Sequence, residues 1–295
     1  MSPRPHHRTA LASTIASIFA AIVCGTSAHA AVIYSESFDY GATNGSLEGQ
    51  NGGTGFSEAW TAGNPGITYS AAGLTFSDFS VSGGMATATG SNGIGSAILT
   101  RPLDNWLNGR FYGSFLSQVL ATSEFSISSG MALGPQDISH GEKSLGILAP
   151  SNTDALMANS GDFNTSNGST LTQGQTYLTL FKIGVSEISG WTFSADQYDM
   201  FKIGGITEAE LNSADIGTGN SQLWARASVS HSTFTMSHLT ILMNATDGVN
   251  ATLASDEFRL SDTGFNEILI AIPEPSSMAL LALGAGLLTA SRRRR

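Results

Sequence analysis

The chain has 295 residues, enough for one large domain or two small ones. Charged residues make up only 12% of it, 34 residues are glycine, and Asp and Glu outnumber Lys and Arg by 23 to 13. Between residues 31 and 272 there are 22 acidic and seven basic residues, which argues against the basic surface that nucleic-acid binding requires. The composition therefore favours a secreted, loop-rich β protein with no nucleic-acid partner.

Residues 1–30 have the three parts of a secretory signal peptide. Two arginines make the start basic, and an apolar stretch follows over residues 10–23. Ala28 and Ala30 then provide the small side chains of a cleavage site. We predict that the Sec export machinery translocates the chain and that cleavage occurs before Ala31.

The single cysteine, Cys24, lies inside this segment. Two alternatives to cleavage stay open, namely a retained N-terminal anchor and a lipid attached to Cys24. If cleavage occurs before Ala31, the mature chain has no cysteine for a disulfide, a thiolate metal site or a nucleophile.

The C-terminus has three consecutive parts. The first is the tripeptide Pro273, Glu274 and Pro275, which the two prolines keep extended. The second is an uncharged run of 16 residues, Ser276–Ser291, which would span roughly 24 Å as a helix against about 30 Å for a bilayer core. The chain ends on four adjacent arginines: Arg292, Arg293, Arg294 and Arg295. Such charges stop translocation at the cytoplasmic face, so we expect a single transmembrane helix rather than a buried core helix.

This tail, residues 273–295, closely resembles the PEP-CTERM sorting signal of Gram-negative bacteria. The resemblance implies processing by an exosortase, a membrane cysteine protease that cuts near the Pro-Glu-Pro tripeptide. It also implies a precursor anchored in the inner membrane by the C-terminal helix. The final location would be the cell surface, the outer membrane or the extracellular matrix. The resemblance indicates how the protein is sorted, and it indicates no biochemical activity.

Residues 31–272 contain no linker that would divide them, and we predict a single extracellular domain. Within residues 177–183 both alternating sets of side chains are largely apolar, which favours a strand packed on both faces. A helix is expected over residues 206–217, because Thr207 can cap it and Glu210 follows three residues later. The number of strand-like segments favours an all-β, two-sheet sandwich. These segments are residues 31–40, 66–76, 95–103, 110–120, 124–133, 144–150, 176–186, 197–204, 222–230, 237–245 and 266–272.

Three stretches of the domain carry a second resemblance. Residues 35–60 contain FDY, GQNGGTGF and a tryptophan, and they resemble the opening of a group of bacterial surface proteins. Residues 176–186 resemble the central strand of that group, and residues 254–269 resemble its last core strand. The group combines a PEP-CTERM tail with a concanavalin-like, laminin-G-type jelly roll. The resemblance therefore implies a jelly-roll passenger.

Two motifs in these stretches have structural interpretations. The glycines of residues 50–56 permit positive φ angles, so this segment is expected to be a turn that lies flat on a sheet. Glu257 and Arg259 are two residues apart on a strand and therefore share a face. We expect these two residues to form a structural ion pair; a ligand site is the alternative.

The sequence contains few patterns that indicate catalysis. The E-x-D-x-x-E carboxylate string of jelly-roll glycosidases is absent, and so is the G-x-S-x-G serine elbow. His231 and His238 lack a third nearby zinc ligand. We predict no catalytic residue and no cofactor. Ca²⁺ is the alternative, since Asp137, Asp196 and Asp199 could supply oxygen ligands.

The leading hypothesis is a non-enzymatic, exported protein of the cell surface or of an exopolysaccharide matrix. The alternative is a lectin-like carbohydrate-binding module, and a polysaccharide hydrolase is a third hypothesis. Among the tryptophans, Trp191 is the best candidate for a glycan contact, because sugar sites use aromatic faces with polar groups nearby.

Overall fold

The structure is a computed structural model of the whole chain, and the described residues from Val32 onward belong to one compact unit. The described residues are 32–64, 66–90, 95–107, 109–122, 126–134, 144–150, 155–159, 163–165, 172–202, 206–217, 221–223, 225–230, 236–245 and 251–269. The predicted signal peptide and the sorting tail lie outside these residues. No helix within the described part is long and apolar enough to cross a membrane.

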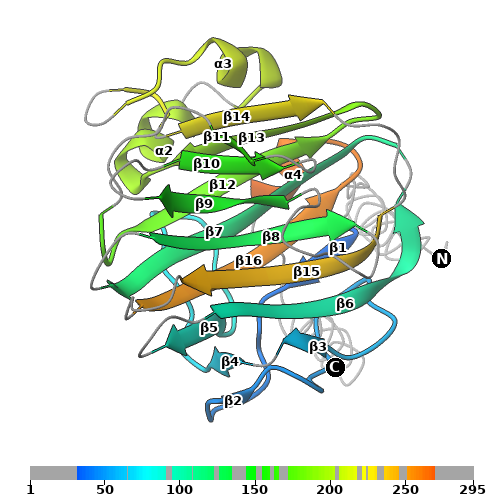
Figure 1. Cartoon of the computed structure of the whole chain (residues 1–295). Helices are drawn as coiled ribbons and strands as arrows, with labels where there is room; N and C mark the ends of the chain where they lie inside the picture. The colour runs from blue at the N-terminus through cyan, green and yellow to red at the C-terminus, as the bar shows by residue number, and fades with distance from the viewer. Residues whose placement is uncertain are drawn as a thin grey trace, which may run out of the picture. The chain divides into compact units, whose positions relative to one another are not determined.

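A nine-stranded antiparallel sheet forms one layer of the described domain (Figure 1). Its strands follow the order β14-β13-β12-β7-β16-β5-β4-β2, and β1 pairs with β16 beside this path. The bounds are β1 (Tyr34–Glu36), β2 (Gly45–Ser46), β4 (Ile67–Ser70), β5 (Met85–Gly90), β7 (Phe111–Thr122), β12 (Thr176–Ile183), β13 (Glu187–Phe193), β14 (Ala225–Ser230) and β16 (Ala251–Ser261).

A seven-stranded antiparallel sheet forms the second layer, with the order β11-β10-β9-β8-β15-β6-β3. Its strands are β3 (Thr61–Asn64), β6 (Gly95–Leu107), β8 (Ser126–Gly134), β9 (Ser144–Pro150), β10 (Ala155–Asn159), β11 (Phe163–Thr165) and β15 (Met236–Ala245). The prediction of an all-β, two-sheet sandwich is therefore confirmed.

Two apolar cores hold the sheets. The intersheet core joins both layers, with Phe115, Phe181 and Phe258 from the nine-stranded sheet facing Leu99 and Ile241 from the other. The outer core lies on the opposite face of the nine-stranded sheet, where three short helices and the segment 74–79 cover it. The helices are α2 (Ala195–Phe201), α3 (Glu208–Ser213) and α4 (Phe265–Leu269).

Strand β12 lies between these two cores. Tyr177, Phe181 and Ile183 belong to the intersheet core, whereas Leu178 and Leu180 belong to the outer core. All residues of the strand after the first are buried. The prediction of a strand packed on both faces is confirmed, and the absence of an exposed face explains why both alternating sets are apolar.

Two segments predicted as strands contain helices in the part that the structure describes. Residues 197–204 fall largely within α2, where Ser194 and Gln197 form a reciprocal capping box. Residues 266–272 overlap α4, which places Phe265 and Ile268 on one face against the outer core. Short apolar runs fit either period, and here packing on the sheet decides in favour of the helix.

Helix α3 is the predicted helix of residues 206–217, although it is shorter than expected. Thr207 is its N-cap, and its hydroxyl accepts a hydrogen bond from the backbone N–H of Glu210. The Glu210 carboxylate in turn accepts a hydrogen bond from the backbone N–H of Thr207 at 3.1 Å. This reciprocal pair satisfies two backbone donors at the start of the helix, as the sequence pattern predicted.

The glycine-rich turn of residues 50–56 has the positive φ angles that its sequence predicts. Gly53 has φ +66° and Gly55 has φ +87°. A Cβ at Gly55 would lie 2.4 Å from the Tyr34 ring and 2.6 Å from the carbonyl oxygen of Ile33. Glycine is therefore required for both backbone conformation and space.

Replacement of Gly55 by alanine should lower the free energy of unfolding by about 2–5 kcal/mol, through left-handed strain and overpacking together. Gly49 is the matched control, because it has φ +82° and a Cβ at this position would meet no atom within 4 Å. Gly49→Ala should incur the strain alone, about 1–2 kcal/mol. Urea unfolding of both variants measures the difference, and equal losses would contradict the packing argument.

Candidate functional site

A buried ion cluster around Glu36 lies beneath the glycine-rich turn. Glu36, at the end of β1, is 1% exposed and pairs with Arg101 of β6 at 2.5 Å. The hydroxyl of Tyr40 donates to the same carboxylate at 2.7 Å, and the indole N–H of Trp60 donates to that hydroxyl at 2.9 Å. The other carboxylate oxygen of Glu36 accepts from the backbone N–H of Phe38 at 2.8 Å.

Residues in and just after the turn supply further hydrogen-bond partners of Arg101. Its guanidinium donates to the side-chain oxygen of Asn51 at 2.6 Å and to the carbonyl of Glu58 at 2.8 Å. The Phe56 ring lies over the guanidinium at 4.3 Å from its centroid, an arrangement that favours a cation. The landmark residues of 35–60 therefore gather around one buried arginine.

Burial dominates the electrostatics of this cluster. It raises the pKa of Glu36, while the hydrogen bond from Tyr40 and the charge of Arg101 act in the opposite direction. Burial also raises the pKa of Tyr40 far above its usual range. Because both oxygens of Glu36 bind protein groups and the carboxylate is shielded from solvent, the arrangement stabilises the fold and offers no acid or base to a substrate.

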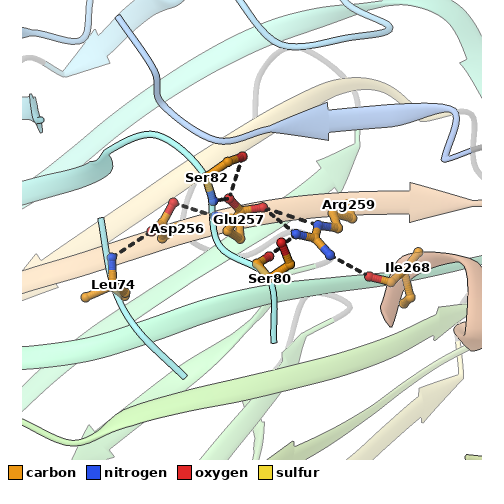
Figure 2. Close-up of polar contacts among 7 residues, drawn as sticks. All are labelled: Leu74, Ser80, Ser82, Asp256, Glu257, Arg259 and Ile268. Carbon is orange, nitrogen blue, oxygen red and sulfur yellow. Dashed lines mark hydrogen bonds and ion pairs between the residues drawn. The ribbon is translucent and has the colours of Figure 1, made fainter. Parts of the chain in front are cut away.

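A second buried cluster lies on β16, at the outer face of the same sheet (Figure 2). Arg259 pairs with Glu257 at 2.9 Å, and both side chains are buried. Glu257 also accepts from the backbone N–H and the hydroxyl of Ser82, the latter at 3.2 Å. Arg259 donates to the carbonyls of Ser80 and Ile268. The predicted structural ion pair is therefore confirmed.

The geometry of this pair depends on an irregularity in β16. The register with β7 shifts between Asp256 and Arg259, and Glu257 has φ +50°. A side chain in this left-handed conformation is uncommon outside glycine and asparagine. The bulge turns Glu257 toward the segment of Ser80 and Ser82, so the two residues do not simply share a face of a regular strand.

Asp256 is the third charged residue of the β16 cluster. It is fully buried, and its two oxygens accept from the backbone N–H of Leu74 at 2.8 Å and of Glu257 at 2.7 Å. Burial, followed by the neighbouring charge of Glu257, raises the pKa of Asp256 well above its usual value. The cluster holds two carboxylates and one guanidinium, and this imbalance favours a protonated Asp256.

Trp191 is a core residue. It lies on β13 with no exposed surface, and its ring meets Phe265 of α4 edge-on at 5.8 Å between centroids. A ring without an exposed face cannot stack on a sugar, so the prediction of a glycan contact at Trp191 is wrong. The sequence around it is polar, but the outer core covers the indole.

The acidic residues suggested for Ca²⁺ take different positions. Asp199 of α2 accepts a hydrogen bond from the ammonium of Lys202 at 2.7 Å and another from Ser77. Asp196 lies in the first turn of α2, and Asp137 is outside the described residues. Within the described ranges, no group of three or more His, Cys, Asp or Glu side chains could hold a metal ion.

Sequence reasoning missed Glu36 and Arg101. They are 65 residues apart in the chain, so no short motif joins them. One signal was available, because Arg101 is a single charge within the otherwise uncharged run of residues 95–103. Charged side chains are almost never fully buried unless they are paired, and such an isolated charge in a strand indicates a partner.

One comparison concerns the C-terminal tail of the chain. Residues 271–295 match the PEP-CTERM protein-sorting motif. The predicted resemblance of the tail is therefore confirmed, although its residues lie outside the described structure. The motif implies an exported, membrane-associated precursor that an exosortase processes. No curated protein matches the sequence.

Several solved structures are similar in fold, all at low identity. A protein of unknown function from Shewanella oneidensis MR-1 has a TM-score of 0.42 at 11% identity, covering 90% of this chain and 99% of that one. The cellulose-induced protein Cip1 has a TM-score of 0.40 at 13% identity, covering 69% of this chain and 90% of that one. The carbohydrate-binding module CBM66 from Bacillus subtilis has a TM-score of 0.36 at 10% identity, covering 69% of this chain and 95% of that one. Similarities at this level carry no functional argument.

Proposed function

We propose that this protein is a non-enzymatic component of the cell surface or of an exopolysaccharide matrix, exported through the Sec machinery and released by an exosortase. The match of residues 271–295 to the sorting motif carries the proposal. The described domain supports it, because Glu36, Arg101, Glu257 and Arg259 are buried and bind one another or the backbone. These charged groups serve a rigid passenger rather than a reaction.

The sorting proposal predicts that Glu274→Ala blocks release of the protein. The apolar run and the four arginines would still hold the precursor in the inner membrane, but the tripeptide would lose the charge between its prolines. Full-length protein should accumulate in the inner-membrane fraction, as measured by immunoblots of fractionated cells. Neutral replacement of Arg292 to Arg295 should instead weaken retention. Normal amounts of the Glu274→Ala variant at the cell surface would contradict the proposal.

Glycan binding is a second candidate function, favoured by one surface of the nine-stranded sheet. Thr68 and Thr87 lie side by side on β4 and β5 with their hydroxyls 3.0 Å apart. Thr89 and Thr252 form a similar pair at 3.2 Å on β5 and β16. These contacts lie at the surface, where their hydroxyl groups could bind a polysaccharide.

A glycan array with the purified protein separates the two candidates. Binding that disappears in a Thr68→Val, Thr89→Val double variant with unchanged unfolding would support the carbohydrate-binding module. Absence of binding across the array would favour the purely structural role.

A further inference from the structure

Helix α4 is the last described element, and it lies directly before the sorting motif. The helix ends at Leu269, and the match to the motif begins at residue 271, so only Ile270 separates them. Pro273 is four residues beyond Leu269. Four residues span at most about 14 Å even when fully extended. The chain between α4 and the tripeptide is therefore short.

The packing of α4 holds this attachment point firmly. Ile268 has no exposed surface and Phe265 is 4% exposed. The Phe265 ring meets Tyr112 of β7 at 5.0 Å and Trp191 of β13 at 5.8 Å, both edge-on. The helix thus packs on β7 and β13, the two strands that flank β12 in the nine-stranded sheet.

A charged contact fixes the end of the helix. Arg259 donates to the carbonyl oxygen of Ile268 at 3.0 Å, in the last turn of α4. A cation in this position satisfies a carbonyl without a helical partner and interacts favourably with the helix dipole. Glu257 and the Phe79 ring, whose centroid is 4.4 Å from the guanidinium, hold Arg259 in turn.

We propose that α4 controls release of the passenger: its attachment to the outer core restricts the access of the exosortase to the tripeptide, and detachment of α4 exposes it. The proposal rests on the proposed sorting function. A protease that binds an extended chain needs several free residues beside the cut, and the folded domain lies within a few residues of Pro273. When local opening precedes cleavage, the cleavage rate follows the population of the open form.

The test measures the release rate of the full-length precursor by pulse-chase labelling in cells that contain the exosortase. One variant inserts six Gly/Ser residues after Ile270, which frees the tripeptide and leaves α4 unchanged. A second variant, Ile268→Ala, weakens the attachment itself. We expect both to raise the release rate by about tenfold.

Leu211→Ala is the matched control for Ile268→Ala. Leu211 of α3 is equally buried in the same outer core, but it is far from the tripeptide in the sequence. We expect its release rate to stay at the level of the parent chain. An unchanged or slower rate with the Gly/Ser insertion overturns the proposal, and so does equal acceleration by Leu211→Ala, which would indicate global unfolding.

Glu274→Ala in each background distinguishes this proposal from the sorting function. Release that stops in every Glu274→Ala background supports cleavage at the motif and leaves the rates above as the test of α4. Release that continues in those backgrounds overturns the sorting function and, with it, the role of α4.

Discussion

Replacement of Arg101 by methionine should lower the free energy of unfolding by about 3–5 kcal/mol, since it leaves a buried carboxylate without its cation. Glu36 is 1% exposed, and solvent cannot replace the guanidinium. The hydrogen bonds from Tyr40 and Phe38 would remain, but they do not neutralise the charge. Guanidinium chloride unfolding at neutral pH measures the loss.

Two further variants separate lost charge compensation from lost side-chain volume. Arg110→Met removes an exposed arginine and should change stability by no more than about 0.5 kcal/mol. Adding Glu36→Gln to Arg101→Met should recover part of the stability, because the buried group is then neutral. A loss below about 1 kcal/mol for Arg101→Met alone would show that the pair is not needed.

Periodicity predicted those elements whose packing is uniform along their length. Strand β12 is buried on both faces, and its sequence contains this information directly in two apolar sets. Helices α2 and α4 are harder to predict from the sequence, because each is only a few residues long and lies on an apolar surface. Over such lengths an apolar run fits a strand as well as a helix, and the contact with the sheet decides between them.

Proximity in the chain explains why one buried cluster was predicted and the other was not. Glu257 and Arg259 are two residues apart, so their pairing could be predicted from the sequence, although the bulge that orients Glu257 could not. Glu36 lies on β1 and Arg101 on β6, which belong to different sheets, so the two residues meet only when the sheets pack on each other. Trp191 was misassigned for a related reason, because the helix that covers it comes from the far end of the chain.

Strand β16 connects these observations. It pairs with β1, β5 and β7, and it carries the second buried cluster. Its Arg259 also holds the last turn of α4 through Ile268. The stability of the sheet centre and the attachment of α4 therefore depend on the same side chain.

Arg259→Met should lower the free energy of unfolding by about 3–5 kcal/mol at neutral pH, since the buried Glu257 carboxylate would lose the cation with which it pairs. The pKa of Asp256, already raised by burial and by Glu257, should rise further because the favourable charge of Arg259 is lost. Folded Asp256 then binds a proton that the unfolded chain, with a pKa of about 3.9, has released. Stability should therefore increase as the pH falls toward the unfolded pKa.

This sign predicts that Arg259→Met loses less stability at about pH 5 than at about pH 8, relative to the parent chain at each pH. Arg226→Met is the matched control, because Arg226 donates to the backbone carbonyls of Leu211, Asn212 and Ala214 at the end of α3. No ion pair links Arg226 to a carboxylate among the described residues, so the loss on its removal should be the same at both pH values. Urea unfolding of both variants supplies the comparison. A pH-independent loss for Arg259→Met would mean that Asp256 does not exchange its proton in this range, and that the cluster acts through packing alone.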